Sequence, residues 1–266
     1  MDIISLNAFA FSARNNFCEK TELETAKVDH PGVEFTMPPQ ETTMDKSKSS
    51  KGGRVITMQM WWWYAFCKFC VQVVMILFFR FRTFGVEHTE IKGGVMIVAN
   101  HQSYLDPPAI GAHIKGKINY LAQKGLFTFK PFAKLLDSLD VIPLEKHGIG
   151  FEGIKETLKR LKNGERVLIF PEGERTRYPN GEIMPFHQAV VTLALRSKVP
   201  IIPAAIAGAF EAWPRGQTLP RLFCPVRVIF GEPIPYEQAA RMTAEELNAY
   251  VESRVRELYE EVRGKK

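Results

Sequence analysis

The chain has 266 residues and a formal net charge of +6, with an isoelectric point near 9.1. It is long enough for one sizeable α/β domain with appendages, and its basic charge suits an anionic partner such as a membrane surface. The lysines and arginines are scattered and form no nucleic-acid-binding signature, which argues against nucleic acid as a partner. Four cysteines make no disulfide framework for a domain of this size, so a reducing compartment fits.

The first 54 residues form a polar segment with no sustained hydrophobic period, which predicts a mostly disordered N-terminal tail over 1–54. Asp2 and the lack of a sustained apolar core argue against a secretory signal. A translation start at Met44 or Met58 is an alternative explanation of this polar segment.

Residues 55–84 are predicted to form a membrane-associated segment around one helix, 58–79, which is apolar and contains a Trp61-Trp62-Trp63-Tyr64 cluster. Its length of about 20 residues could span a bilayer. Lys68 and Gln72, however, place polar groups one turn apart in its middle, and clustered aromatic residues favour the level of the lipid head groups. We therefore expect an interfacial helix; a single span is the second alternative and a buried core helix the third.

Residues 85–266 are predicted to form one domain in which strands alternate with helices. Its fold class is α/β, a mixed, largely parallel sheet with helices on both faces. The expected strands are 94–100, 117–122, 139–144, 166–170, 200–206 and 226–231. The expected helices are 107–114, 130–137, 151–162, 187–197 and 243–262, the last opening with a capping box from Thr243 to Glu246.

The first polar cluster follows the predicted strand 94–100. His101 falls at the end of this strand, and Asp106 follows after a four-residue turn, at the expected N-cap of a helix whose first residue is Pro107. A carboxylate that accepts from one imidazole nitrogen fixes the tautomer and makes the other nitrogen more basic. The spacing is compatible with a general base, His101, oriented by Asp106; alternatively, both are ordinary turn residues.

The second polar cluster follows the predicted strand 166–170 and contains Glu172, Arg175 and Arg177. Ligand sites in α/β sheets form beyond the carboxyl ends of strands, and arginine has a planar fork of donors that matches phosphate oxygens. The alternative is a solvated charged turn. We rank Arg175 first and Lys146 second as phosphate ligands, whereas Arg177 and Lys124 are as readily explained as surface charges.

Four segments in sequence order resemble the motifs of the glycerolipid acyltransferases, notably the 1-acylglycerol-3-phosphate acyltransferase family. Residues 100–107 (Asn-His-Gln-Ser-Tyr-Leu-Asp-Pro) resemble the His-x4-Asp motif, and residues 170–176 (Phe-Pro-Glu-Gly-Glu-Arg-Thr) resemble the Phe-Pro-Glu-Gly-Thr-Arg-Ser motif. Residues 141–146 and 199–203 stand in the places of the second and fourth blocks. The likeness spans roughly residues 80–235, and four ordered blocks are far more specific than one short motif.

The resemblance implies a role for each matching residue. His101 matches the catalytic base and Asp106 its partner, while the other matches are to substrate-binding positions: Glu172, Gly173, Arg175, Lys146 and Pro203. Glu174, Lys146 and Gln188 stand where the family usually has Thr, Arg and Gly. These departures leave the chemistry unchanged and bear on the identity of the acceptor.

The implied activity moves a fatty-acyl group from a thioester, acyl-CoA or acyl-carrier protein, to the free hydroxyl of lysophosphatidate in phospholipid biosynthesis. No metal and no redox cofactor is expected, since the thioester supplies the driving force. Backbone N–H groups at the helix start after Asp106 are expected to bind the oxyanion, and apolar residues around 120–140 to line an acyl tunnel. The implied location is the cytoplasmic face of a membrane, peripheral or single-pass.

Other functions remain open at this point. The same family includes enzymes for other lysolipid head groups. A lipid or thioester hydrolase would need a nucleophile, but none of the candidate serines lies in a G-x-S-x-G elbow. A non-catalytic lipid-binding protein would retain the apolar helix. A G-x-G-x-x-G match at 148–153 is separated from the preceding strand by three residues, which argues against a dinucleotide site.

Overall fold

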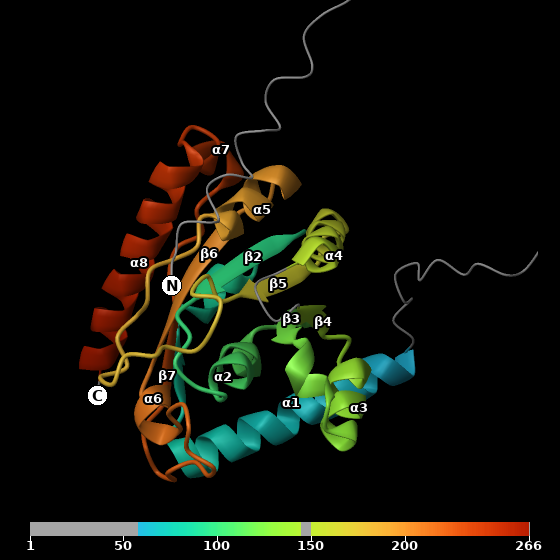
Figure 1. The fold of residues 1–266 in the computed structure, drawn as a ribbon, viewed down its shortest axis with the longest axis vertical. Coiled ribbons are helices and arrows are strands. Elements are labelled where there is room, and N and C mark those ends of the chain that lie inside the picture. The colour runs from blue at the N-terminus through green and yellow to red at the C-terminus, as the bar shows by residue number, and fades with distance from the viewer. Residues whose placement is uncertain (1–57, 145–149, 266) are drawn as a thin grey trace, which may run out of the picture. The chain divides into compact units, whose positions relative to one another are not determined.

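A computed structural model of the chain describes residues 58–144 and 150–265. The predicted tail 1–54 and the expected phosphate ligand Lys146 lie outside the described residues. Within them, the expected fold class is confirmed: a mixed, mostly parallel sheet lies between helices (Figure 1).

The sheet has seven strands in the described part of the chain, in the order β1-β7-β6-β2-β5-β3-β4. Neighbouring strands are parallel except for the antiparallel pair β6 and β7. The strands are β1 (Arg82–Phe84), β2 (Val95–Ala99), β3 (Ile118–Gln123), β4 (Ile142–Leu144), β5 (Arg166–Ile169), β6 (Ile201–Ala207) and β7 (Arg227–Phe230).

Helices cover both faces of the sheet. Helices α4, α5 and α8 pack on one face, and α1 and α2 on the other (Figure 1). The helices are α1 (Met58–Phe79), α2 (Asp106–His113), α3 (Lys130–Ser138), α4 (Gly150–Lys162), α5 (Ala189–Ser197), α6 (Ala209–Ala212), α7 (Tyr236–Ala239) and α8 (Ala244–Gly264). Two 3-10 turns, η1 (Val86–Thr89) and η2 (Lys124–Phe127), complete the described elements.

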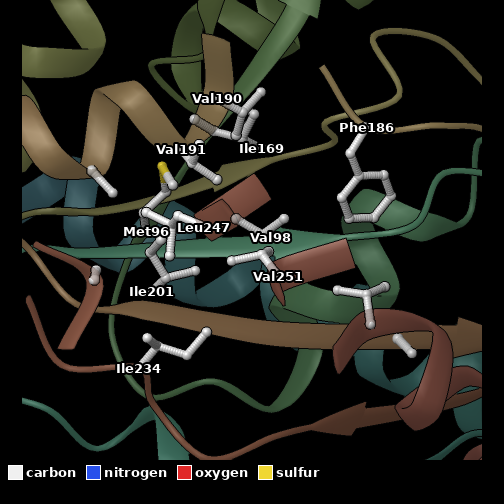
Figure 2. Packing of buried hydrophobic residues seen from close by; sticks show 14 of the residues in the cluster. Met96, Val98, Ile169, Phe186, Val190, Val191, Ile201, Ile234, Leu247 and Val251 are labelled. Atoms are coloured by element: carbon white, nitrogen blue, oxygen red, sulfur yellow. The ribbon is translucent and has the colours of Figure 1, made fainter. Parts of the chain in front are cut away.

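Strand β2 shows why the buried strands are continuous apolar runs in the sequence. Met96 and Val98 pack with Leu247 and Val251 of α8 (Figure 2), whereas Ile97 and its alternate neighbours pack toward α2. Because successive side chains point to opposite faces and both faces are covered, every position of the strand must be apolar.

The differences from the predicted elements are small. Strand β1 was not predicted, because it has only three residues and none of them is buried. The predicted strand 139–144 is shortened to Ile142–Leu144, since α3 extends to Ser138 and Asp140 then adopts a positive φ of 58°. The capping box of α8 is confirmed: the Thr243 hydroxyl accepts from Glu246 N at 3.2 Å, and the Glu246 carboxylate accepts from Thr243 N at 2.8 Å.

Helix α1 lies along the domain with its polar groups turned inward. Lys68 donates to the carbonyl of Ile114, and Gln72 Nε2 donates to the carbonyl of Ala112 at 2.5 Å. Both carbonyls lie at the C-terminal end of α2, where a helix leaves its last carbonyls without partners. The stretch Trp61–Phe79 is long and apolar enough to cross a membrane by length and composition, yet most of it is exposed, which is not the burial of a core helix.

Candidate active site

The two polar clusters of the sequence meet at one edge of the sheet. Strands β2 and β5 are parallel neighbours, with Val98 opposite Ile169. Their carboxyl ends therefore open at the same edge, and the residues that follow them, His101 and Glu172, become neighbours. This adjacency is set by strand pairing.

His101 and Asp106 are in direct contact, as their spacing suggested. The Nδ1 atom of His101 lies 2.8 Å from Oδ2 of Asp106; the His101 side chain is 18% exposed, whereas that of Asp106 is fully buried. Asp106 is the first residue of α2 and Leu105 occupies the N-cap, so the expected N-cap position of Asp106 was one residue off. Its carboxylate points back along the chain and also accepts from the N–H groups of Gln102 and Ser103, at 2.6 and 2.7 Å.

Glu172 holds the main chain of His101. One carboxylate oxygen accepts from His101 N at 2.6 Å and the other from Met184 N at 2.8 Å, and the His101 carbonyl accepts from Thr176 N at 2.8 Å. Burial raises the pKa of Glu172 to about 8, even though the two N–H donors favour its ionised form. Glu172 does not line the cavity described below, so its placement favours positioning of the His101 turn over contact with an acceptor.

Two further contacts orient the His101 turn. The imidazole stacks on the Phe170 ring with centroids 4.1 Å apart and planes 15° apart. Asn100 is fully buried, and its side-chain amide both donates to the Ile206 carbonyl and accepts from Ile206 N, at 3.0 and 2.8 Å. The chain just after β2 is thereby tied to β6 on one side, while Phe170, the residue after β5, stacks on the imidazole ring from the other.

Arg175 lines the same cavity as His101 and has one buried guanidinium nitrogen without a partner among the described residues. Its guanidinium carbon lies 3.6 Å from the centroid of the Tyr104 ring, a cation–π contact. Its buried Nη1 has no hydrogen-bond partner in the described part of the chain, and burial lowers the pKa of Arg175. A buried donor without a partner is costly, so an anion that accepts from it would be bound favourably.

The carboxylate of Glu174 is neutralised by two arginines. Arg177 donates to one oxygen of Glu174, and Arg215 Nη1 lies 2.8 Å from the other. These contacts lower the pKa of Glu174. The negative charge that Glu174 adds at a position where the family usually has Thr is therefore paired. Arg177 is 69% exposed and does not line the cavity.

Arg215 is a site residue that the sequence alone did not indicate. It follows α6, lines the same cavity as His101 and Arg175, and also donates to the Arg175 carbonyl at 3.3 Å. The turn that contains it is tied to the His101 turn, because Ser103 Oγ donates to the Trp213 carbonyl at 2.8 Å. The usable signal was the Trp-Pro-Arg-Gly turn at 213–216, which comes after the predicted strand 200–206.

A cavity of about 500 Å³ extends from this edge into the molecule. Gly173 and polar residues, among them His101, Arg175 and Arg215, line it near the ends of β2 and β5, and mostly apolar residues line the remainder between α1, α2, α3 and β3. The apolar lining includes Val71, Pro108, Leu121, Leu126, Phe132, Leu135, Leu136 and Leu139. Gly173 has a φ of +74°, a left-handed backbone conformation that residues other than glycine rarely adopt.

Pro203 lies apart from this group. It is buried within β6 opposite Val98, and its carbonyl accepts from Gly231 N at 2.8 Å, so it packs the sheet and does not line the cavity. Of the expected site residues, the structure thus brings together His101, Asp106, Glu172, Gly173 and Arg175. Across residues 58–144 and 150–265, no group of three His, Cys, Asp or Glu side chains is placed to hold a metal ion.

Comparisons with known proteins agree with this geometry. A family model described as Acyltransferase matches residues 80–207. The chain is 28% identical over 206 residues to the 1-acyl-sn-glycerol-3-phosphate acyltransferase of Bacillus subtilis, covering 76% of this chain and 98% of that protein. It is 30% identical over 159 residues to the enzyme of the same name from Cocos nucifera, covering 58% of this chain but only 49% of that protein.

A solved structure shows the same fold. The crystal structure of the 1-acyl-sn-glycerophosphate (LPA) acyltransferase, PlsC, from Thermotoga maritima matches with a TM-score of 0.62 and 23% sequence identity, covering 76% of this chain and 82% of that one. The family model and the relatives lead to one conclusion: residues 80–207 form a PlsC-type acyltransferase domain, and the protein is an acyltransferase.

Proposed function

We propose that this acyltransferase transfers a fatty-acyl group from an acyl thioester to the free hydroxyl of lysophosphatidate, the type of acceptor that the names of its relatives indicate. The single observation that carries the proposal is the His101–Asp106 pair: His101 lines a largely apolar cavity that is also lined by Arg175, whose buried Nη1 has no hydrogen-bond partner among the described residues. A base, an anion-binding donor and room for an acyl chain are the three features that this reaction requires.

In the proposed reaction, Nε2 of His101 removes the proton of the acceptor hydroxyl as its oxygen attacks the thioester carbonyl carbon. The C–S bond then breaks, the acyl group remains on the acceptor oxygen, and the proton passes to the departing thiolate. Asp106 on Nδ1 would keep Nε2 free to accept the proton and would stabilise the imidazolium. No enzyme nucleophile takes part.

The start of α2 is a poor source of the oxyanion donors that were expected there. Pro107 and Pro108 have no N–H, and the N–H of Ala109 already donates to the Leu105 carbonyl at 2.9 Å. Stabilisation of the tetrahedral oxyanion must therefore come from donors other than these three residues.

The acceptor phosphate is proposed to bind Arg175, with Arg215 as a second cation. Both line the cavity near His101, and Arg215 is held there by Glu174. The guanidinium fork matches phosphate oxygens, and two forks would explain selection of a phosphate monoester over a neutral head group. The donor is proposed to be acyl-CoA or acyl-carrier protein, its acyl chain lying among the apolar residues of the cavity.

We further propose that α1 lies in the membrane interface, at the cytoplasmic face, and does not span the bilayer. Near its start, Trp63 Nε1 donates to Ser138 Oγ at 3.0 Å; at its end, the Phe79 carbonyl accepts from Val226 N at 2.9 Å. A helix of 22 residues is about 33 Å long, so attachment near both ends keeps its whole length beside the domain. A spanning helix would have to break these contacts.

The test is a panel of lysolipids with different head groups, each supplied with one acyl-CoA and assayed for acylated product and for released thiol. We expect product with lysophosphatidate, little with lysophosphatidylcholine, and thiol release that depends on the acceptor. Thiol release without acceptor would instead identify a thioester hydrolase. Acyl transfer to lysophosphatidate that is unaffected in the His101→Ala variant would contradict the proposed mechanism.

A further inference from the structure

The segment between α6 and β7 exposes large apolar side chains. Leu219 is 77% exposed, Leu222 is 49% exposed and Phe223 is 59% exposed. Exposed apolar side chains are common singly, but a group of them marks a surface that contacts a protein or a membrane. We call residues 219–223 the apolar loop.

The apolar loop is held in this exposed position by the end of α1. Phe223 N donates to the Phe78 carbonyl at 2.5 Å, and Arg221 N donates to the Ala212 carbonyl at 2.7 Å. Phe223 has a φ of +65°, which a bulky residue adopts only when its surroundings impose it. The exposed side chains therefore belong to an anchored segment that lies beside the last turn of α1, as Figure 1 shows.

The apolar loop continues an exposed apolar face of α1. Large side chains recur every three or four residues on this face, which places them on one side of the helix: Trp62, Phe66, Phe69, Val73 and Ile76. Leu77 and Phe78 are also exposed at the end of α1, and the Phe78 ring lies 6.5 Å from the Phe223 ring. Helix and loop thus form one surface.

Cations lie at the edge of this surface. Arg80 directly follows α1 and Arg221 lies within the apolar loop, and both are exposed. An apolar strip flanked by arginines matches the boundary between acyl chains and anionic head groups in a lipid bilayer. A protein partner would not require cations in these positions.

We propose that the apolar loop is a second membrane-inserting element, which enters the same leaflet as the exposed face of α1. This inference rests on the proposed membrane-bound function and extends it. A single helix in the interface can roll about its axis, whereas a helix and a loop fix the orientation of the domain. Because α1 also lines the cavity, two contacts would hold the cavity beside the bilayer from which the acceptor comes.

The test compares vesicle binding of the Leu219→Glu/Leu222→Glu variant with that of wild type, by flotation with vesicles of phosphatidylcholine and phosphatidylglycerol. We expect binding to fall by about tenfold or more, since two apolar side chains are lost from the lipid contact. Phe151→Glu is the matched control: Phe151 is 77% exposed on α4, on the other face of the sheet, and its variant should change binding less than about twofold. Unchanged binding of the loop variant would overturn the proposal.

A second measurement does not depend on loss of binding. In a protein whose four native cysteines are replaced by serine, a polarity-sensitive label on Leu219→Cys should report an apolar environment when vesicles are added. The same label on Phe151→Cys should not change. A label at position 219 that stays in water would overturn the proposal and indicate that the loop has no partner. A wild-type dimer that the Leu219→Glu/Leu222→Glu variant converts to monomers would overturn it in favour of self-association.

Failure of this inference can be separated from failure of the proposed function. With a short-chain lysophosphatidate that is fully dissolved, the loop variant should be as active as wild type, and it should lose activity only when the acceptor is embedded in vesicles. Equal loss with both forms of acceptor would overturn the membrane role of the loop. A wild type that acylates neither form would refute the proposed function, while the flotation and label results would still decide the role of the loop.

Discussion

The two faces of the sheet differ in how completely they are filled. On the face covered by α4, α5 and α8, which we call the closed face, side chains such as Leu247 and Val251 are fully buried in one apolar cluster. On the face covered by α1 and α2, the open face, the apolar packing gives way to the cavity of about 500 Å³ between the helices and β3.

Because of this difference, we expect residues that mainly stabilise the fold to lie on the closed face and residues that take part in catalysis to lie on the open face. The closed face contains the helix–sheet packing through which α8 contacts β6 and β7, whereas the open face combines apolar packing with the substrate cavity. Substitutions on the two faces should therefore affect different measurements. Each prediction below tests whether this division holds.

The largest effect is expected on the open face, at His101. Replacing His101 with Ala should lower kcat by about 10²–10⁴-fold, the contribution of a positioned base, while the melting temperature stays near that of wild type. Thiol release and thermal unfolding measured on the same sample would check both parts. Asp106→Asn should lower activity as well, but also stability, because the Asp106 carboxylate accepts two backbone N–H groups.

On the closed face, Leu247→Ala should lower the free energy of unfolding by about 2–5 kcal/mol, the cost of a cavity in a packed core. The KM for either substrate should not change. Leu219→Ala is the control, since Leu219 is largely exposed and its truncation should alter stability by no more than about 0.5 kcal/mol. A changed KM in the folded Leu247→Ala protein would show that the two faces are coupled.

At the mouth of the cavity, Arg215→Ala should raise the KM for lysophosphatidate by about tenfold, the effect of one charged hydrogen bond. The KM for the acyl donor should be unchanged. Arg177→Ala removes the other arginine bound to Glu174, but Arg177 does not line the cavity, so a change of less than about twofold is expected. Equal effects of the two variants would indicate a general charge effect and no specific phosphate contact.

The smallest effect concerns the pH dependence of stability through Glu172. Its folded-state pKa is about 8, above the usual value of 4.5, so its protonated form favours the folded state. This contribution is complete below pH 4.5 and is lost as pH rises to about 8. As pH rises from 4.5 to 8, the melting temperature of wild type should therefore decrease relative to that of Glu172→Gln. A difference in melting temperature that stays constant over this range would contradict the raised pKa.

The sequence was most informative where local pattern alone determines structure. Strands β2 and β5 are continuous apolar runs because both faces of the sheet are covered, and the polar residues after them mark the sheet edge. The contact of His101 with Asp106 follows from a short turn between them. These parts of the fold and the site could be predicted from neighbouring residues.

The remainder depends on contacts between distant segments. Arg215 reaches the site only because β6 lies beside β2 and Ser103 Oγ donates to the Trp213 carbonyl. Strand β1 exists because it pairs with β7, more than 140 residues later, and its own three residues carry no apolar pattern. The inward orientation of Lys68 likewise depends on carbonyls at the end of α2, which the pattern of α1 does not reveal.

His101 is held at two points by acids from different parts of the chain: Asp106 binds its ring, and Glu172 binds its backbone N–H. The imidazole consequently has one orientation before either substrate arrives. The entropy cost of aligning it is met once, when the chain folds, and does not recur in each turnover.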